Sequence, residues 1–302
     1  MTDDPLWPRA SAWLEANTRE HAWPRERHPR KVQMALLGVP AFRTSLSPTR
    51  ADTTPAAVRG ALARFSTYVS SRDLDLADLM LVDLGDQVDP DDPDGERRTI
   101  EAVRLLPEAM VLAVGGDNSI TYAVAHGSCA DGLITLDAHH DLRDGRSNGS
   151  PVRRLIEEGG MDGRRVVQIG ISDFANSPAY AARARELGIT VINRTELEHR
   201  PMADAMAEAL EIASGGPTGR VHVDLDVDVC DRSVAPACPA SLPGGLSAAQ
   251  LLAAARLAGA DQHVVSIDLT EIDASRDAPD GRTVRLAALC ILEAATGVLL
   301  RD

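Results

Sequence analysis

The sequence predicts an α/β protein built on a parallel β-sheet, and three observations lead to this class. The chain contains eight short, β-branched apolar runs; helical patterns lie between them; and Gly, Pro or polar clusters end the runs. Strands that alternate with helices form parallel sheets whose two faces are both covered. A closed barrel and an open doubly wound sheet both satisfy eight such units. In both architectures, functional side chains gather at the carboxyl ends of the strands.

The expected elements follow one another along the whole chain. The strands are predicted at residues 32–40, 79–85, 110–115, 133–136, 165–170, 189–192, 220–224 and 263–268. Helices are predicted at residues 54–65, 97–106, 119–125, 203–213 and 248–257, the first with Thr54 as its N-cap. No repeat or linker interrupts this order, so we expect one domain, residues 1–302. Residues 1–31, with three tryptophans among prolines and charges, form an N-terminal arm.

Composition limits the class of partner and compartment. The formal net charge of −14 argues against nucleic acid and anionic membranes as partners. The four cysteines show no C-x-x-C spacing, which predicts a reduced, cytoplasmic protein. The first residues do not resemble a signal peptide, and no run approaches the roughly 18 apolar residues of a membrane span. We therefore expect a small molecule as the partner.

The first functional signal lies where the strand at 133–136 ends. Asp137, His139 and Asp141 follow at alternate positions, and alternate side chains of an extended chain point to the same side. Carboxylates with an imidazole are a ligand set for a divalent first-row metal. Taken alone, this stretch is equally well read as a strand end with solvated acids.

A second acidic stretch, residues 220–228, favours the metal. Strict alternation places Asp224, Asp226 and Asp228 on one face and apolar residues on the other. Three neighbouring carboxylates repel one another and need a cation, and Asp is rare in ordinary strands. Four carboxylates from the two stretches would neutralise two divalent cations, which together make water a nucleophile near neutral pH. This oxygen-rich set favours Mn²⁺ or Mg²⁺ over zinc by ligand type.

Three motifs resemble the metal-binding signatures of the ureohydrolase superfamily, which contains the arginases, agmatinases and formimidoylglutamases. They are Gly115-Gly-Asp-Asn-Ser119, Asp137-Ala-His-His-Asp141 and Asp226-Val-Asp228, the last followed by Ala235-Pro236. The similarity covers most of the chain, including Thr270-Glu271. It implies an open three-layer α/β sandwich with a mainly parallel eight-stranded sheet and two Mn²⁺ per subunit. It also implies hydrolysis of a guanidine or amidine C–N bond by a homo-oligomer, a trimer or hexamer.

Two departures from the arginase pattern indicate the branch. The first signature normally ends in a His that binds one metal, and here Asn118 stands in its place as a weaker donor. One Mn²⁺ would therefore be bound weakly or be absent. Arginases and agmatinases carry a His in the loop after the second signature, where Asn148 cannot shuttle a proton. The loop at 147–153 and the stretch at 168–180 are instead similar to one branch of the formimidoylglutamases.

This resemblance implies a role for each candidate residue. The metal ligands would be Asn118, Asp137, His139, Asp141, Asp226 and Asp228. The catalytic set would be Glu271, which pairs with the amidinium, together with Asp141 and Asn148. The substrate-binding set would be Asn148, Asn176, Arg143 and Arg153, with the arginines on carboxylates. The implied reaction is hydrolysis of N-formimidoyl-L-glutamate to L-glutamate and formamide in histidine degradation.

Two alternatives stay open at this point. The first is an agmatinase- or arginase-like hydrolase that acts on a different guanidino compound. The second is a non-catalytic family member whose metal site is impaired, which the substitution at Asn118 suggests. Against the second, the other five expected ligands and Glu271 are all present. Clustered carboxylates without a function would be expected to disappear first, because unpaired buried charges destabilise a fold.

Overall fold

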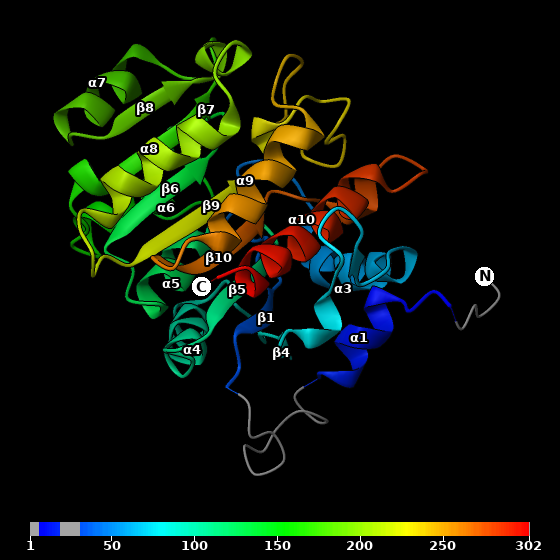
Figure 1. Ribbon diagram of the computed structural model, residues 1–302. Helices are drawn as coiled ribbons and strands as arrows, with labels where there is room; N and C mark the ends of the chain where they lie inside the picture. The colour runs from blue at the N-terminus through cyan, green and yellow to red at the C-terminus, as the bar shows by residue number, and fades with distance from the viewer. Residues whose placement is uncertain (1–5, 19–30, 302) are drawn as a thin grey trace.

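The computed structural model describes residues 6–18 and 31–301, and its centre is an eight-stranded sheet (Figure 1). In spatial order the strands are β4 (Leu81–Asp86), β1 (Met34–Val39), β5 (Met110–Gly115), β10 (Val264–Thr270), β9 (Val221–Asp226), β6 (Gly132–Leu136), β7 (Val166–Ile171) and β8 (Thr190–Asn193). Every neighbouring pair is parallel. The sheet is open, with β4 and β8 at its edges. The predicted three-layer fold class is confirmed, and the barrel alternative is wrong.

The inner strands are buried on both faces, because helices cover the sheet from both sides. Every residue of β1, β5 and β6 is buried, and these strands are nearly continuous apolar runs, as is typical of parallel sheets. In β9, Asp224 and Asp226 are as fully enclosed as Val223 and Leu225. The alternation in β9 therefore separates a polar from an apolar face, and neither face is exposed to solvent.

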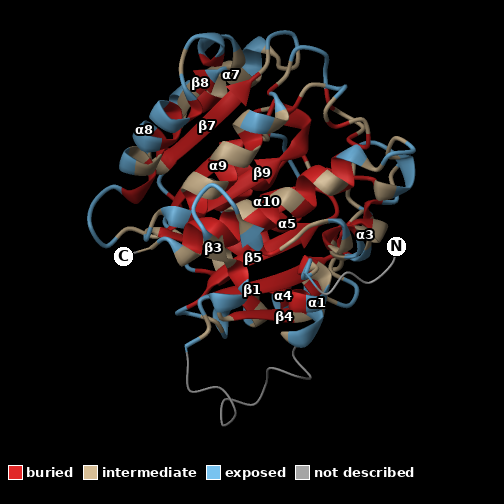
Figure 2. Cartoon of the chain, turned by 45° about the vertical axis from the view of Figure 1, so that its right-hand side comes forward, coloured by how far each residue is buried: buried red, intermediate tan, exposed pale blue. Residues whose placement is uncertain are grey.

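The helices form the two outer layers (Figure 1). One layer consists of α3 (Thr54–Ala61), α8 (Met202–Ser214), α9 (Ala248–Ala260) and α10 (Arg282–Leu299), which contribute to the largest hydrophobic cluster. The other consists of α4 (Pro93–Arg104), α5 (Ile120–Gly127), α6 (Pro151–Glu157) and α7 (Pro178–Glu186). Figure 2 shows the buried residues concentrated in the sheet and on the helix faces that contact it. Within the described ranges, no helix is long and apolar enough to cross a membrane.

Part of the expected N-terminal arm packs on the protein itself. Helix α1 (Ala10–Ala16) buries Trp13 and Leu14 in the largest hydrophobic cluster. The backbone carbonyl of Asn17 accepts a hydrogen bond from the backbone N–H of Asp83 in β4 (2.9 Å). The rest of the arm, residues 1–5 and 19–30, lies outside the described residues. The described part of the arm thus covers the β4 edge of the sheet.

The start of α3 differs from the expectation for Thr54. The N-cap is Thr53, and Thr54 is the first helical residue, with Pro55 following it. The hydroxyl of Thr54 is buried and donates to the backbone carbonyl of Ile272 (2.5 Å). This bond joins the start of α3 to the loop after β10. The sequence rule for helix caps could not anticipate it, because the partner lies 218 residues away.

The strand order brings distant segments together at one edge of the sheet. Strand β10 lies between β5 and β9, so the carboxyl ends of β5, β10, β9 and β6 are adjacent at its middle. The polar segments at 116–119, 137–141, 226–228 and 270–271 lie at these four ends. Open α/β sheets bind ligands where the direction of winding changes. The predicted site therefore lies where this fold class places its sites.

Candidate metal centre

The segment after β6 presents its polar side chains through a turn and does not continue the strand. The Oδ1 atom of Asp137 accepts a hydrogen bond from the backbone N–H of His139 (2.6 Å). Asp141 has a φ of 51°, in the left-handed region that residues other than Gly rarely adopt. The chain has therefore left the extended conformation by Asp141. The alternate spacing predicted an extended chain whose side chains converge. In the structure a turn, and not an extended strand, orients these side chains.

The segment after β9 crosses over to the segment after β6. A short 3₁₀ helix, Val227–Val229, begins with Asp226, whose Oδ1 accepts the backbone N–H of Asp228 (2.8 Å). One carboxylate oxygen of Asp228 accepts the backbone N–H of Ala138 (2.9 Å). The other lies 2.7 Å from Nδ1 of His139. Asp228 thus connects the two acidic stretches.

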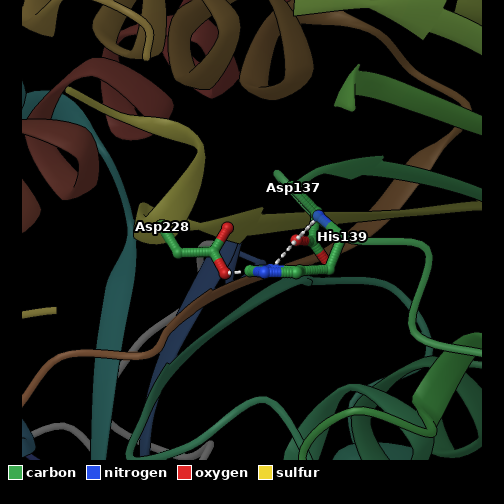
Figure 3. A group of neighbouring side chains, drawn as sticks. All are labelled: Asp137, His139 and Asp228. Carbon is green, nitrogen blue, oxygen red and sulfur yellow. Dashed lines mark hydrogen bonds and ion pairs between the residues drawn. The ribbon is translucent and has the colours of Figure 1, made fainter. Parts of the chain in front are cut away.

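Three of these side chains form a cluster that could hold a metal ion. Ligand atoms of Asp137, His139 and Asp228 all lie within 4.8 Å of one another, and Figure 3 shows them pointing toward one another. The Oδ2 atom of Asp137 is buried and has no hydrogen-bond partner among the residues that the structure describes. Because a buried oxygen without a partner is costly, this atom favours a cation beside it. Two carboxylates and an imidazole suit a divalent first-row metal, so these residues fit the predicted ion.

Burial and mutual repulsion raise the pKa of most carboxylic acids in this centre. Burial, and then the charges of Asp228 and Asp141, hold the pKa of Asp137 well above its usual value. Burial and the charge of Asp228 do the same to the pKa of Asp226. The pKa of Asp141 is raised to about 7, because burial outweighs the attraction of His139. A divalent cation would relieve this repulsion and allow all these acids to ionise.

His139 carries the positive charge that the metal-free centre needs. Burial lowers the pKa of its imidazole, but the hydrogen bond and charge of Asp228, with the charge of Asp141, outweigh burial and raise it to about 9. Burial likewise opposes ionisation of Asp228, yet the attraction of His139 leaves the pKa of Asp228 below its usual value. His139 is therefore protonated at neutral pH, and a metal ion that binds through Nδ1 must displace that proton.

The loop after β5 brings Asn118 against Asp141. Gly116 permits the loop to pass close to the loop after β1, because a Cβ there would lie 1.8 Å from the carbonyl oxygen of Ala41. The Nδ2 atom of Asn118 donates to Asp141 (2.8 Å), while its Oδ1 accepts from the hydroxyl of Thr121 (2.6 Å). The amide oxygen expected to act as a weak ligand is thus already engaged. These contacts do not support a ligand role for Asn118 in this orientation.

Glu271 lies beside this centre, at the carboxyl end of β10. It has a φ of 62°, and its Oε1 accepts from the backbone N–H of Asn118 and from Nδ2 of Asn148, both at 2.8 Å. Burial and then the charge of Asp117 raise the pKa of Glu271 to about 8, against these two hydrogen bonds. A cationic group beside Glu271 would lower this pKa and pair with the carboxylate. Glu271 can therefore bind an amidinium.

Two of the predicted substrate-binding residues lie in the loop that joins Asp141 to α6. Asn148 connects two loops, since its Nδ2 reaches Glu271 and its Oδ1 accepts the backbone N–H of Leu46 (3.0 Å). Arg143 is exposed, and across residues 6–18 and 31–301 its guanidinium has no hydrogen-bond or ion-pair partner. Its positive charge also acts on Asp141 and partly opposes the rise in the pKa of that carboxylic acid. Arg143 is therefore available to an anion near the metal centre.

Arg153 lies in the first turn of α6, directly after this loop, and is buried. Its Nε donates to the backbone carbonyl of Arg143 (2.8 Å), and its Nη2 donates to that of Gly145 (2.6 Å). Its guanidinium also pairs with Glu157 and Glu158. The predicted contact of Arg153 with substrate finds no support in these bonds. Arg153 holds the shape of the loop that carries Arg143.

Asn176, the remaining predicted substrate-binding residue, joins the loop after β7 to the metal segment. Its Nδ2 donates to the backbone carbonyl of Ala138 (2.9 Å), and its Oδ1 accepts the backbone N–H of His140 (3.0 Å). Its amide therefore fixes the backbone on both sides of His139, which does not support direct substrate binding. The His140 ring is buried, and its Nδ1 lies 2.6 Å from Oε1 of Gln168.

A buried polar group beneath the metal centre was not assigned a role from the sequence. Asp224 accepts from the hydroxyl of Thr135 (2.8 Å), and its neighbour Asp268 lies 3.2 Å from Nε2 of His222. Asp224 and Asp268 are paired in register on β9 and β10. The alternation His222-x-Asp224-x-Asp226 was the available signal, because it continues the metal face one layer deeper into the sheet.

Comparison with known protein families agrees with this fold and site. The model of the arginase family matches residues 32–297. A formimidoylglutamase from Halalkalibacterium halodurans is 36% identical over 281 residues, 88% of each chain. A guanidinopropionase from Pseudomonas aeruginosa is 34% identical, over 87% of this chain and 88% of the relative. The chain therefore belongs to the arginase family.

Solved structures agree with this assignment. The formimidoylglutamase from Bacillus subtilis superposes with a TM-score of 0.90 at 29% identity, over 100% of this chain and 95% of the other. A Trypanosoma cruzi formiminoglutamase with Mn²⁺ has a TM-score of 0.84 at 24% identity, over 98% and 100%, and shares the fold. The predicted enzyme class, a metal-dependent hydrolase of C–N bonds in linear amidines, is confirmed.

Proposed function

We propose that this enzyme hydrolyses N-formimidoyl-L-glutamate to L-glutamate and formamide. The observation that carries this proposal is the presence of two oppositely charged groups, each suited to a different part of the substrate, at one site. Glu271 is a buried acid suited to an amidinium. Arg143, in the neighbouring loop, has no ion-pair partner within residues 6–18 and 31–301 and is suited to a carboxylate. N-formimidoyl-L-glutamate carries both kinds of group, whereas agmatine carries two cations and no carboxylate.

Each residue has a distinct task in this reaction. Asp137, His139 and Asp228 would hold Mn²⁺, with Asp141 and Asp226 beside them for a second ion. The metal centre, when occupied, supplies a water molecule that is acidic enough to act as a nucleophile near neutral pH. Water adds to the formimidoyl carbon, and the bond from this carbon to the glutamate nitrogen breaks. The oxygen stays on formamide, and a proton goes to the leaving nitrogen.

The surrounding side chains orient the substrate for this step. Glu271 pairs with the amidinium, and Asn148 holds the Glu271 carboxylate at 2.8 Å from its own amide nitrogen. Arg143 binds a carboxylate of the glutamate part, which fixes the distance between the anion and the reacting carbon. Because Asn118 donates to Asp141, we infer that one metal ion is bound more weakly than the other.

The proposed setting of the enzyme is the cytoplasm, as a homo-oligomer. All four cysteines are free, three of them buried, which is consistent with a reducing compartment. The trimer or hexamer rests on the resemblance to ureohydrolases alone. Light scattering of the purified protein measures the subunit number directly.

The experiment that tests the substrate is a comparison of amidino compounds with added Mn²⁺. We expect release of glutamate and formamide in equal amounts from N-formimidoyl-L-glutamate, and no turnover of agmatine. Arg143→Ala should raise KM for formimidoylglutamate about tenfold or more, on the order of a charge-assisted hydrogen bond of about 1.5–3 kcal/mol. Arg146→Ala is the matched control, because Arg146 lies in the same loop but pairs with Glu96.

Two results would contradict the proposal. Efficient turnover of agmatine without turnover of formimidoylglutamate would show that the site selects a cation. Turnover of 3-guanidinopropionate in preference to formimidoylglutamate would keep the roles of Glu271 and Arg143 but change the substrate. The second result has a specific basis, since a guanidinopropionase is 34% identical to this chain.

A further inference from the structure

The side chain of Arg143 lies across the backbone of Gly149. A Cβ atom added to Gly149 would lie 2.8 Å from Cδ and 3.1 Å from Nε of Arg143. It would also lie 3.3 Å from Cδ1 of Leu46. Gly149 itself is buried, while Arg143 and Leu46 above it are exposed. Arg143 thus occupies the space that a side chain at position 149 would fill.

The backbone around Arg143 is fixed on both sides. Its N–H donates to the carbonyl of Gly149 (2.9 Å), and its own carbonyl accepts from Arg153 (2.8 Å). Arg153 also binds the carbonyl of Gly145 (2.6 Å). With the backbone held, the direction of the guanidinium depends on what the side chain rests against. Arg143 rests against Gly149.

The other arginines in and around this loop are committed to carboxylates. Arg146 and Arg154 both pair with Glu96, and Arg183 pairs with Asp144 and Glu157. Among the described residues of the segment at 141–153, which is the loop and the first turn of α6, Arg143 is the one arginine whose guanidinium has no such partner. Arg143 is therefore the arginine of this segment that is free to bind a substrate carboxylate, and its direction determines where that carboxylate lies.

We propose that Gly149 is a positioning residue that sets the direction of Arg143 and thereby the carboxylate selectivity of the enzyme. This inference rests on the proposed function of the site. The backbone of Gly149 lies outside the left-handed region, so Ala is compatible with its conformation. An added methyl group would therefore move the far end of the flexible Arg143 side chain and leave the backbone in place. The guanidinium would be displaced, and the distance from amidinium to carboxylate that the site accepts would change.

The test is a double-mutant cycle with Gly149→Ala and Arg143→Ala. We expect Gly149→Ala to raise KM for formimidoylglutamate about fivefold, with kcat changed less than about twofold. In the Arg143→Ala background, Gly149→Ala should have no further effect on KM. Mn²⁺ affinity and the melting temperature should stay at their wild-type values. Gly60→Ala is the matched control, because an added Cβ there meets no atom of the described residues within 4 Å.

Several outcomes would overturn the inference. Equal effects of Gly149→Ala with and without Arg143 would show that Gly149 does not act through Arg143. An unchanged KM would show that the contact of Arg143 with Gly149 does not affect substrate binding. A drop in kcat with weakened Mn²⁺ binding would indicate a role for Gly149 in the metal centre. Gly149→Ser repeats the test with a second side chain if the Ala variant folds poorly.

Failure of the proposed substrate can be told apart from failure of this inference. Binding of L-glutamate, measured by calorimetry, gives the same cycle without turnover. If formimidoylglutamate is not hydrolysed but the cycle still shows coupling for L-glutamate or a guanidino acid, the role of Gly149 stands and the substrate proposal falls. If formimidoylglutamate is hydrolysed and no coupling appears, the role of Gly149 falls and the substrate proposal stands.

Discussion

At the scale of single residues, a proton on His139 does in the metal-free protein part of what a metal ion would do. Its imidazole lies 2.7 Å from Asp228 and 3.5 Å from Asp137, and its pKa of about 9 keeps it charged at neutral pH. A metal ion must bind the neutral imidazole. Metal binding and proton release are therefore coupled in this centre.

We expect the affinity for Mn²⁺ to rise as the pH increases from about 6.5 to about 8.5. Each proton displaced contributes about a tenfold gain per pH unit below the pKa of its group, which is about 9 for His139. Asp141, with a pKa of about 7, adds to the slope at the lower end. Calorimetric titration in two buffers with different ionisation enthalpies measures both the affinity and the protons released. The same affinity at every pH would show that His139 is neutral before metal binds.

Sequence reasoning identified the metal cluster better than the residues around it. The spacing of Asp137 and His139, with a second acidic stretch at Asp228, indicated that these side chains lie together, and the structure brings them together. The contacts of the Arg153 guanidinium could not be predicted in the same way. Whether a guanidinium meets a substrate or a backbone carbonyl depends on how the loop closes, and sequence spacing does not encode that. The orientation of Asn118 likewise depends on Thr121 one turn later.

At the scale of elements, all eight strands of the sheet were predicted, because a buried β-branched run that ends in Gly or polar residues is a strong local signal. Helix α10 was not predicted, although it has 18 residues. It packs against both α9 and α3, and most of its residues are buried. The strand order was also beyond local pattern, because β10 pairs on one side with β5, which lies far away in the chain.

The turn after β7 carries a strained residue whose replacement should stabilise the protein. Phe174 has a φ of 66°, and its side chain is fully exposed. We expect Phe174→Gly to be more stable than Phe174→Ala by about 1 kcal/mol, because only Ala keeps the Cβ that makes this conformation costly. Urea unfolding of the two variants measures the difference. Leu105 is the matched control, since it is exposed with a φ of −71°, and there Ala should be the more stable. The same order at both positions would contradict the explanation.

At the scale of the whole molecule, the acids of the metal centre lie at the carboxyl ends of the middle strands of one sheet, so their repulsion acts on the fold as a whole. Removal of metal by a chelator should lower the melting temperature, and added Mn²⁺ should restore it. A ligand present at about 100 times its Kd stabilises the folded state by about 2.7 kcal/mol. Differential scanning calorimetry with and without chelator measures the effect. A melting curve that does not respond to chelator would contradict the assignment of the centre.

The size of this effect should depend on pH. In the metal-free protein the pKa is about 9 for His139, about 7 for Asp141 and about 8 for Glu271, each above its value in an unfolded chain. The folded state therefore binds more protons than the unfolded state, and its stability falls as the pH rises from about 4 through about 9. Chelator should destabilise the protein more at about pH 9 than at about pH 6. The reverse order would show that these groups do not hold their protons in the folded protein.

The position of β10 has a consequence for biosynthesis. This strand, residues 264–270, is the last of the sheet to leave the ribosome, yet it lies between β5 and β9. Before it emerges, the nascent chain can pair only a β4–β1–β5 group and a β9–β6–β7–β8 group, with nothing to join them. Insertion of β10 unites the two halves and brings Glu271 next to Asn118 in the same event. The proposed site can therefore be completed only after β10 has emerged, because this last strand joins the two halves of the sheet.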